Sequence, residues 1–525
     1  MTENLADKSI QRIVIVGGGS AGWITAGLIA AEHVAPNSGI SVTLVESPQV
    51  KTIGVGEGTW PTMRTTLQRI GISETEFLTE CSASFKQGTR FVGWLTGEDD
   101  DIYYHPFSAP TGFAHINLVP FWQARRDEMS FVNAVTVQGQ VCDRNLAPKQ
   151  ETTPEYAGVV NYAYHLDAGK FAELLQRHCT QRLGVRHIVD HVTAINGQAD
   201  QDIRSISTEK SGDIEGDLFV DCTGFSSMLL GRHYGIRYLD RKDVLFNDSA
   251  LAVQVPYADE AGPIASQTNS TARDAGWIWD IGLVHRRGLG YTYSSAHTED
   301  ARAEQVLRDY ISATSGQSGK QYDLRKISFR PGHREVFWHQ NCVAVGMSSG
   351  FLEPLEASAL VLVELAGRML SDSLPANRAL MDTVARRYNE TFLYRWDRII
   401  DFLKLHYVLS RRNDSEYWKD NRQASSIPER LRELLALWHF QVPWHADFPR
   451  TDEIFSSASY QYVLYGMGFW TQAGGPAGLK RRAEQAQRLF AENIKQTSRI
   501  IAHLPGNREL LSRIHERGLP VAQAG

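Results

Sequence analysis

The glycine-rich segment of residues 17–22 limits the possible folds more than any other part of the sequence. It reads GGGSAG and follows a short apolar run, Arg12–Val16. A helix-like stretch of residues 21–34 comes next, and a second apolar run, 40–45, ends at Glu46. A strand, a glycine turn, a helix and a second strand in this order predict a βαβ unit that binds a dinucleotide.

The residues of this segment have separate physical roles. Gly17 permits the tight turn, Gly19 lets the backbone approach a pyrophosphate, and Gly22 allows the helix to pack closely on the strand. The helix start at Ser20 and Ala21 presents free N–H groups and the positive end of the helix dipole to the phosphates. A glycine turn without a ligand is the alternative that the hexapeptide alone leaves open.

Two acidic residues bear on which dinucleotide is bound. Glu46 can accept hydrogen bonds from ribose hydroxyls and would repel the 2′-phosphate of NADP. A later apolar run, 218–222, contains Asp221 in the sequence VDCTG. This run resembles the segment that closes over the nucleotide in FAD-dependent monooxygenases and reductases, so we expect FAD and a contact from Asp221. The alternative is that Asp221 only caps a turn.

Length and composition exclude several classes of protein. The chain has 525 residues, enough for about three domains, and its 42% hydrophobic and 22% charged residues are typical of globular proteins. A net charge of −6 argues against nucleic acid as the main partner. The polar N-terminus and the lack of an apolar run of about 18 residues indicate neither a secretion signal nor a membrane span. Five widely spaced cysteines favour a reduced, soluble, cytoplasmic protein without a metal site.

Apolar periodicity predicts the further elements of the chain. The region from 245 to 345 is β-rich. The apolar spacing from about residue 377 onward is helical, and the tryptophans of that part are expected in the core or at an interface. The individual predictions are a helix at 167–183, strands at 251–255, 278–283, 290–294 and 342–346, and a helix at 356–370.

Four more segments occur in a fixed order along the chain. They are TIGVGEGTWP (52–61), SFKQGTRFVGW (84–94), GWIWDIG (276–282) and GFLEPLEAS (350–358). Together with GGGSAGW at 17–23, they resemble the flavin-dependent tryptophan halogenase family. The resemblance covers residues 10 to 400, and more loosely the rest of the chain.

Motifs and resemblance together predict an α/β fold with mixed α+β parts. A Rossmann-like, FAD-binding βαβ core of the flavin monooxygenase type would carry a β-rich substrate layer and a helical C-terminal region. The FAD-binding module would span residues 1–375, with substrate-site segments interleaved at about 60–165 and 240–340. The helical region, 376–525, would complete the substrate site.

The resemblance also implies a mechanism. A separate flavin reductase supplies FADH2 by diffusion, and oxygen reacts with the reduced flavin. The product oxidises bound halide, chloride or bromide, to hypohalous acid. That acid travels through a tunnel to a second site, where a small indole- or tryptophan-like aromatic waits. The chain could form a homodimer, and neither nucleic acid nor a membrane is an expected partner.

The family's functional residues fall on identifiable positions of this sequence. The catalytic lysine corresponds to Lys86 and the active-site glutamate to Glu356, while the halide site lies beside the backbone of Ser358 and Ala359. Further flavin contacts are expected at Gly54, Val55 and Gly56, in the strap that links the two sites, and at Met347 and Gly350. The expected substrate-pocket residues are Glu57, Trp277, Trp279 and Ile281.

The chemistry of Lys86 and Glu356 supports these roles. A lysine ammonium can hydrogen-bond and polarise hypohalous acid, whereas a neutral amine can form a haloamine. Phe85 and Phe91 flank Lys86 in the sequence and could supply an apolar setting. A carboxylate can stabilise the cationic arene or take its proton. The alternatives are a solvated surface lysine and, for Glu356, a charge at a helix N-terminus, with Glu353 as a neighbouring rival.

Two positions depart from the family pattern. Ala359 stands where the family has glycine after the glutamate, which could reshape the halide pocket if that glycine needs a positive φ. Gly282 replaces the proline that ends the W-x-W-x-I-P signature, and a glycine loosens this wall between substrate and flavin. Halide preference and the suppression of hydroxylation are therefore open.

Two other functions share parts of this pattern. An FAD-dependent aromatic monooxygenase would need the flavin site but not Lys86. A flavin-binding protein without halogenating activity would need neither Lys86 nor Glu356. His105, His115 and His165 could line a pocket, but single histidines are more often ordinary hydrogen-bonded residues.

Overall fold

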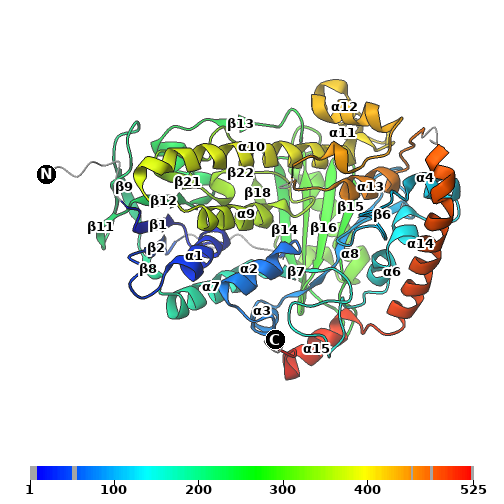
Figure 1. The fold of residues 1–525 in the computed structure, drawn as a ribbon, viewed down its shortest axis with the longest axis horizontal. Coiled ribbons are helices and arrows are strands. Elements are labelled where there is room, and N and C mark those ends of the chain that lie inside the picture. The colour runs from blue at the N-terminus through cyan, green and yellow to red at the C-terminus, as the bar shows by residue number, and fades with distance from the viewer. Residues whose placement is uncertain (1–8, 50–55, 451–452, 473–476, 522–525) are drawn as a thin grey trace. The chain divides into compact units, whose positions relative to one another are not determined.

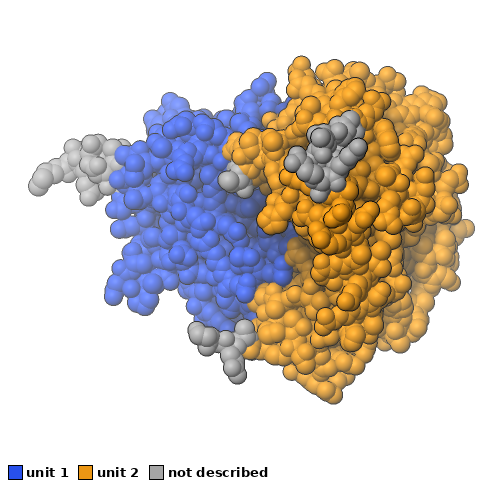
Figure 2. Space-filling model, turned by 45° about the vertical axis from the view of Figure 1, so that its right-hand side comes forward, with its two compact units in different colours: residues 1–81, 166–241, 330–396 blue, residues 82–165, 242–329, 397–525 orange. Residues whose placement is uncertain are grey.

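The computed structural model describes residues 9–49, 56–450, 453–472 and 477–521 (Figure 1). The chain divides into two units, each assembled from three separate stretches (Figure 2). Unit 1 comprises residues 1–81, 166–241 and 330–396, and unit 2 comprises residues 82–165, 242–329 and 397–525. Within the described ranges, no helix combines the length and the apolar character needed to cross a bilayer.

Unit 1 is built on a six-stranded sheet. Its strands are β1 (Arg12–Val16), β2 (Ser41–Glu46), β8 (Arg186–Val189), β12 (Leu218–Asp221), β20 (Trp338–His339) and β21 (Cys342–Ala344). They lie in the order β20-β21-β12-β1-β2-β8, and β1 pairs in parallel with both β2 and β12. The predicted strands at 12–16, 40–46 and 218–222 are confirmed. Their nearly continuous apolar character fits parallel strands that are buried on both faces.

Three helices of unit 1 pack together: α1 (Ser20–His33), α7 (Ala168–Arg182) and α9 (Ser358–Asp372). α1 is buried along most of its length, which explains its apolar composition on all sides. The start of α7 is fixed by Asp167, whose carboxylate accepts hydrogen bonds from the backbone N–H groups of Gly169 and Lys170 at 3.0 and 3.2 Å. This N-cap confirms the helix predicted over 167–183.

Smaller elements complete unit 1. β9, β10 and β11 form an antiparallel sheet, and β13, β19 and β22 form another. The bounds are β3 (Glu57–Gly58), α2 (Thr62–Ile70), α3 (Glu74–Glu80), β9 (Val192–Asn196), β10 (Ser205–Thr208), β11 (Gly212–Glu215), β13 (Tyr238–Asp240), β19 (Gly332–Arg334) and β22 (Gly350–Phe351).

Unit 2 contains a seven-stranded sheet (Figure 1). Its strands are β5 (Gly88–Val92), β6 (Ile102–Pro106), β14 (Ser249–Pro256), β15 (Thr268–Arg273), β16 (Gly276–Gly282), β17 (Arg286–Tyr293) and β18 (Arg325–Ser328). The order is β18-β14-β17-β16-β15-β5-β6, and only the β15–β5 pair is parallel among these. Helix α8 (Asp300–Ser315) packs on β14 and β17 and buries Leu307 and Ile311. The strands predicted at 251–255, 278–283 and 290–294 correspond to β14, β16 and β17, which confirms a β-rich layer.

A short antiparallel pair in unit 2 carries the proposed catalytic lysine. β4 (Ser84–Lys86) pairs with β7 (Ala163–Leu166).

The C-terminal part of the chain is helical, as expected, and Trp418 and Trp438 are buried in its core. The C-terminal helices are α10 (Arg378–Val408), within which the boundary between the units falls, α11 (Glu416–Asp420), α12 (Glu429–Trp438), α13 (Ser457–Gly466), α14 (Ala477–Ile501) and α15 (Asn507–Arg517). Short helices earlier in unit 2 are α4 (Val119–Trp122), α5 (Phe131–Val135) and α6 (Gln138–Asp143).

Candidate active site

The glycine turn between β1 and α1 has the geometry of a phosphate cradle. Gly17 has φ 118°, and a Cβ atom there would lie 2.2 Å from the carbonyl oxygen of Cys222. A Cβ atom at Gly22 would lie 1.9 Å from the carbonyl oxygen of Gly17. At Gly19, in contrast, a Cβ atom would meet nothing within 4 Å. Gly17 and Gly22 are therefore required by packing, whereas Gly19 borders open space that a ligand can use.

The start of α1 adds to the attraction for an anion. Gly19 is the N-cap residue and has no side chain with which to satisfy the first N–H groups. The first turn, which includes Ser20 and Ala21, contains no acidic residue. Free N–H groups and the helix dipole therefore both favour a phosphate at this end.

Glu46 ends β2 beside this turn. A Cβ atom at Gly18 would lie 2.1 Å from Cδ of Glu46, so the carboxylate reaches back over the glycines. One of its oxygens lies 3.0 Å from Nε2 of His187 on β8. The ring of His187 in turn lies 5.0 Å from the ring of Trp23, centroid to centroid. No sequence motif pointed to His187, because it lies about 140 residues from Glu46 in the chain.

Asp221 organises its own turn. Its fully buried carboxylate accepts hydrogen bonds from N and Oγ1 of Thr223 at 3.0 and 2.6 Å. It also accepts bonds of 2.9 Å from the backbone N–H groups of Leu229 and Leu230. This is the capping role that the sequence left open as an alternative. A direct contact between Asp221 and the cofactor stays a prediction.

Met347 and Gly350 lie on the segment that follows β21. The preceding Gly346 passes so close to α1 that a Cβ atom there would lie 2.8 Å from Cβ of Ala21. Met347 reaches the turn after β12, where a Cβ atom at Gly224 would lie 3.6 Å from its Cε. Gly350 instead begins β22 and pairs with His333 of β19. Ala21, Gly224 and Met347 therefore gather at the carboxyl ends of parallel strands, where α/β sheets bind their ligands.

The expected strap is described only in part. Gly54 and Val55 lie outside the described residues. Gly56 is buried, and Glu57 lies in β3. Although Glu57 is only partly buried, desolvation of its carboxyl group raises its pKa to about 7. Trp60, at the end of the strap sequence, donates a hydrogen bond of 2.7 Å from its indole N–H to the carbonyl oxygen of Glu356.

Glu356 lies just before α9 and is 4% exposed. The helix begins at Ser358, not at residue 356 as predicted, because Ala357 has φ 54° and ψ 38° and cannot be part of a right-handed helix. The left-handed residue of this segment is thus Ala357, and Ala359 lies inside the helix on its exposed side. No side chain caps the first turn. The N–H groups at Ser358 and Ala359 are placed where a halide would be attracted.

Lys86 is buried in unit 2, with 1% of its surface exposed. A solvated surface lysine, the alternative left by the sequence, is therefore wrong. Its Nζ lies 5.5 Å from the ring centroid of Phe107. The two phenylalanines that flank it in the sequence pack elsewhere, Phe85 against Tyr162 and Phe91 against Tyr103. The apolar setting expected for Lys86 is thus present, but a phenylalanine that the sequence did not point to supplies it.

Four hydrogen bonds from distant segments hold β4 in place. The hydroxyl of Ser84 donates to the carbonyl oxygen of Gly282 at 2.5 Å, which ties β4 to the end of the signature strand β16. The side-chain amide of Asn507 donates to the carbonyl oxygen of Phe85 at 3.2 Å. Gln87 donates from its backbone to Ser266 and from its side chain to Leu146, both at 2.7 Å. The backbone around Lys86 is therefore fixed on both sides.

The signature residues lie on β16, with alternate side chains on one face. Trp277 is fully buried, and its ring lies 6.3 Å from that of Trp94 and 6.2 Å from that of Trp279. Trp279 is 8% exposed and covers Gly290, where a Cβ atom would lie 2.0 Å from its ring. Trp277 is thus part of the core, and Ile281 is buried as well, with 6% of its surface exposed.

Gly282, the departure from the signature proline, lies in a confined place. A Cβ atom there would lie 3.0 Å from both Ile264 and the hydroxyl of Tyr257. A larger residue would have to displace these neighbours, so the wall at this point is closely packed despite the glycine.

The histidines considered for a pocket differ in burial. His105 is buried against Phe402, at 5.4 Å between ring centroids, whereas His115 is exposed.

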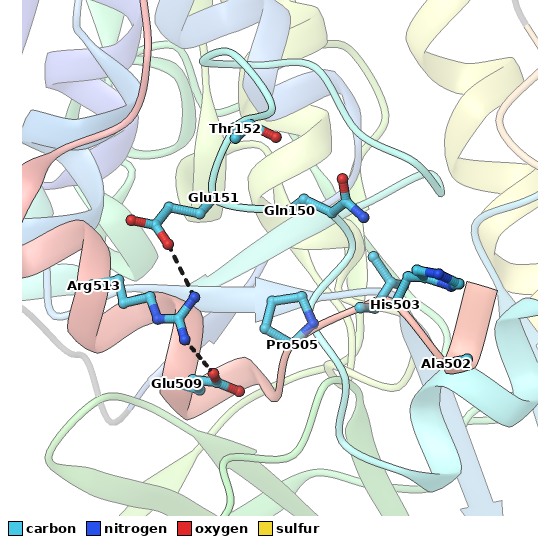
Figure 3. A pocket seen from close by; sticks show the side chains of 9 residues that line it. Gln150, Glu151, Thr152, Ala502, His503, Pro505, Glu509 and Arg513 are labelled. Atoms are coloured by element: carbon cyan, nitrogen blue, oxygen red, sulfur yellow. Dashed lines mark hydrogen bonds and ion pairs between the residues drawn. The ribbon is translucent and has the colours of Figure 1, made fainter. Parts of the chain in front are cut away.

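A surface cavity of about 370 Å³ lies elsewhere in unit 2 (Figure 3). Residues 150–152, 502–505, Glu509 and Arg513 line it. Arg513 bridges the carboxylates of Glu151 and Glu509 at 2.9 and 2.6 Å, so its positive charge offsets one of the two negative charges of the cavity. It contains none of the residues that the sequence predicts to be functional.

Comparison with known proteins agrees with this arrangement of motifs. A model of the tryptophan halogenase family matches residues 12–481. A tryptophan 6-halogenase of Streptomyces toxytricini is 33% identical, with 97% of this chain and 99% of that protein covered.

Solved structures give the same result. A tryptophan halogenase from Shewanella frigidimarina NCIMB 400 is 48% identical, with a TM-score of 0.95 and coverage of 98% of this chain and all of the other. A flavin-dependent halogenase from Brevundimonas sp. BAL3 is 31% identical, with a TM-score of 0.85 and coverage of 96% and 99%. The chain is therefore an enzyme of the flavin-dependent tryptophan halogenase family.

Proposed function

We propose that this enzyme halogenates an indole- or tryptophan-like aromatic with hypohalous acid made from FADH2, O2 and halide. Lys86 delivers the halogen, and Glu356 assists the reaction at the arene. The burial of Lys86 in a fixed strand carries the proposal, because it keeps the amine at one position and away from bulk solvent, where a hydrogen bond to hypohalous acid is stronger than in water. The residues proposed to bind the flavin and the halide belong to unit 1, and Lys86 and the tryptophan signature of β16 belong to unit 2.

The residues of unit 1 fit an FAD. The open space at Gly19 and the uncapped start of α1 would receive the pyrophosphate, and Glu46 would accept hydrogen bonds from the ribose. The turns around Asp221 and Met347 and the strap residue Gly56 would line the rest of the site. Reduced FAD, delivered by a separate flavin reductase, would supply the reducing equivalents with which O2 and halide yield hypohalous acid.

The roles of the chain's own groups follow from charge. The N–H groups of Ser358 and Ala359 hold the halide at the start of α9. The Lys86 ammonium donates a hydrogen bond to the oxygen of hypohalous acid and so polarises the oxygen–halogen bond. The arene carbon bonds the halogen, the electrons of the oxygen–halogen bond pass to the oxygen, and the oxygen takes a proton from the Lys86 ammonium and leaves as water. Glu356 takes the proton that the cationic arene loses.

The names of the relatives and the residues proposed to line the site both support the substrate class. Two relatives are named tryptophan halogenases, and one of them a tryptophan 6-halogenase. Trp279 and Ile281 on β16 are the proposed lining of the aromatic site within unit 2. The native substrate is an electron-rich arene of the indole type, halogenated with chloride or bromide.

Replacement of Lys86 tests the proposal. The protein is incubated with FAD, a flavin reductase, NADH, bromide and indole, and brominated indole is measured by mass spectrometry together with free hypobromous acid. With a reagent in the solvent that traps free hypobromous acid, we expect Lys86→Met to abolish brominated indole while the trapped acid still forms. Lys149→Met is the matched control, because Lys149 is equally buried in unit 2 and donates a hydrogen bond of 3.0 Å to the carbonyl oxygen of Pro154.

Three outcomes would contradict it. Undiminished bromination by Lys86→Met would show that the lysine does not deliver the halogen. An equal loss in Lys149→Met would show a general effect of removing a buried ammonium. Hydroxylated indole as the main product of the unaltered enzyme would support an aromatic monooxygenase instead.

A further inference from the structure

His165 lies beside Lys86 on the same face of the β4–β7 pair. His165 is directly opposite Ser84, and Ala163 is directly opposite Lys86. Opposite residues of an antiparallel pair share a face, and so do residues two apart in one strand, so Lys86 and His165 are diagonal neighbours. The residue directly opposite Lys86, Ala163, has only a methyl side chain. His165 is fully buried.

One nitrogen of His165 is engaged and the other is not. Nε2 lies 2.8 Å from Oγ1 of Thr268 at the start of β15. Nδ1 has no hydrogen-bond partner in the part of the chain that the structure describes. A buried polar atom left in this state is unfavourable, so it points to a ligand that is bound during function.

The surroundings keep the imidazole neutral. Burial, and secondly the charge of Lys86, lower the pKa of His165 well below its usual value. A neutral imidazole has one N–H group and one lone pair. If the Thr268 hydroxyl donates to the lone pair of Nε2, the N–H group is on Nδ1, where it is free to donate.

We propose that the Nδ1–H group of His165 is a second hydrogen-bond donor, next to the Lys86 ammonium, for the oxygen of hypohalous acid. This inference rests on the proposed function of Lys86. Negative charge develops on that oxygen as the oxygen–halogen bond breaks, and two buried donors stabilise it better than one. Two donors also hold the acid in one orientation until the arene reacts. Thr268 is a positioning residue that sets the tautomer of His165.

Two amide variants separate the nitrogens of His165. Asparagine places an N–H donor near the position of Nδ1, whereas glutamine places its amide near Nε2 and can reach only Thr268. The readout is the partition of hypobromous acid between brominated indole and a trapping reagent in the solvent. We expect His165→Gln to move at least several-fold more of the acid into the trap at an unchanged total, and His165→Asn to restore much of the coupling. A partition unchanged in His165→Gln, or lost equally in both variants, would overturn the inference.

Lys86→Met, measured in the same assay, separates this inference from the proposed function. If it leaves the partition unchanged, the proposed function fails. If it moves the partition and His165→Gln does not, only the role of His165 fails.

A second measurement needs neither flavin nor turnover. The 15N spectrum of histidine-labelled, flavin-free protein should contain a neutral imidazole with its proton on Nδ1, assigned as the signal that is missing in His165→Gln. Thr268→Val should change the tautomer of that signal. A proton on Nε2 in the unaltered protein would refute the proposed donor.

Discussion

The side-chain amide of Asn507 donates a hydrogen bond of 3.2 Å to the main-chain carbonyl of Phe85, the residue before Lys86. Asn507 is the first residue of α15 and is 1% exposed. The same amide lies 3.4 Å from the carbonyl oxygen of Ala265. The last helix of the chain thus fixes the strand that carries the proposed catalytic lysine, although 422 positions separate the two partners.

Removal of this amide should reduce both stability and halogen transfer. Asn507→Ala leaves the buried carbonyl of Phe85 without this donor, so the free energy of unfolding should fall by about 1–3 kcal/mol. The freed strand should also lower the fraction of hypobromous acid that reaches indole, measured per folded protein. Asn493→Ala is the matched control, because its buried amide donates to the carbonyls of Asn133 and Ala134 at 2.9 and 3.1 Å. An equal effect of both variants on halogen transfer would contradict the specific role of Asn507.

The two glycines of the turn should respond differently to an added methyl group. Gly22→Ala places Cβ on the carbonyl oxygen of Gly17, so it should destabilise the protein in urea unfolding. Gly19→Ala meets no protein atom and has φ −77°, so it should cost less than about 1 kcal/mol. We nevertheless expect Gly19→Ala to weaken FAD binding at least tenfold, measured by flavin fluorescence, because the methyl group fills the space for the pyrophosphate. Tight FAD binding by Gly19→Ala would show that the phosphates lie elsewhere.

Local pattern made the βαβ unit predictable, and long-range contacts explain what was missed. β1, α1 and β2 follow from an apolar run, a glycine turn and a second apolar run, each of which is readable in a short window. His187 beside Glu46 and Phe107 beside Lys86 come from other segments of the chain. The residues next to them in the sequence match none of the motifs that predicted the site. Such contacts depend on how the strands are ordered in a sheet, which a single sequence does not encode in any short pattern.

The start of α9 shows a different limit. The apolar spacing predicted a helix from residue 356 to residue 370. The structure instead has a left-handed residue at Ala357, which ends the turn after Pro354 and leaves Glu356 outside the helix. Tertiary contacts override local propensity at this point, and one of them is the hydrogen bond from Trp60 to the carbonyl of Glu356.

The substitutions Ala357→Gly and Ala359→Gly should therefore have opposite effects on stability. Ala357→Gly relieves a left-handed alanine and should stabilise the protein by up to about 1 kcal/mol. Ala359→Gly, which restores the family residue, places glycine inside a helix and should destabilise it by up to about 1 kcal/mol. Thermal unfolding of the two variants measures this difference. Stabilisation by Ala359→Gly would show that residue 359, and not 357, carries the strain.

Glu364 is a buried acid of α9 and should give unit 1 a pH-dependent stability. It is 1% exposed, and its carboxyl oxygens accept hydrogen bonds from Thr66 at 2.6 Å and Thr62 at 3.3 Å. Burial raises its pKa to about 8, against the opposing effect of these hydrogen bonds. The folded protein therefore keeps the proton over a range in which the unfolded chain, with an ordinary glutamate pKa near 4.5, has lost it.

The sign of the effect follows from this difference. The contribution of Glu364 to the free energy of unfolding is fully present below pH 4.5 and is lost as the pH rises through about 8. Glu364→Gln cannot lose a proton, so its stability relative to the unaltered protein should increase steadily between about pH 5 and about pH 9, measured by urea unfolding. Glu32→Gln, at an exposed glutamate of the same unit, should show no such trend. Parallel stability curves for the unaltered protein and Glu364→Gln would mean that the buried acid is ionised in the folded state.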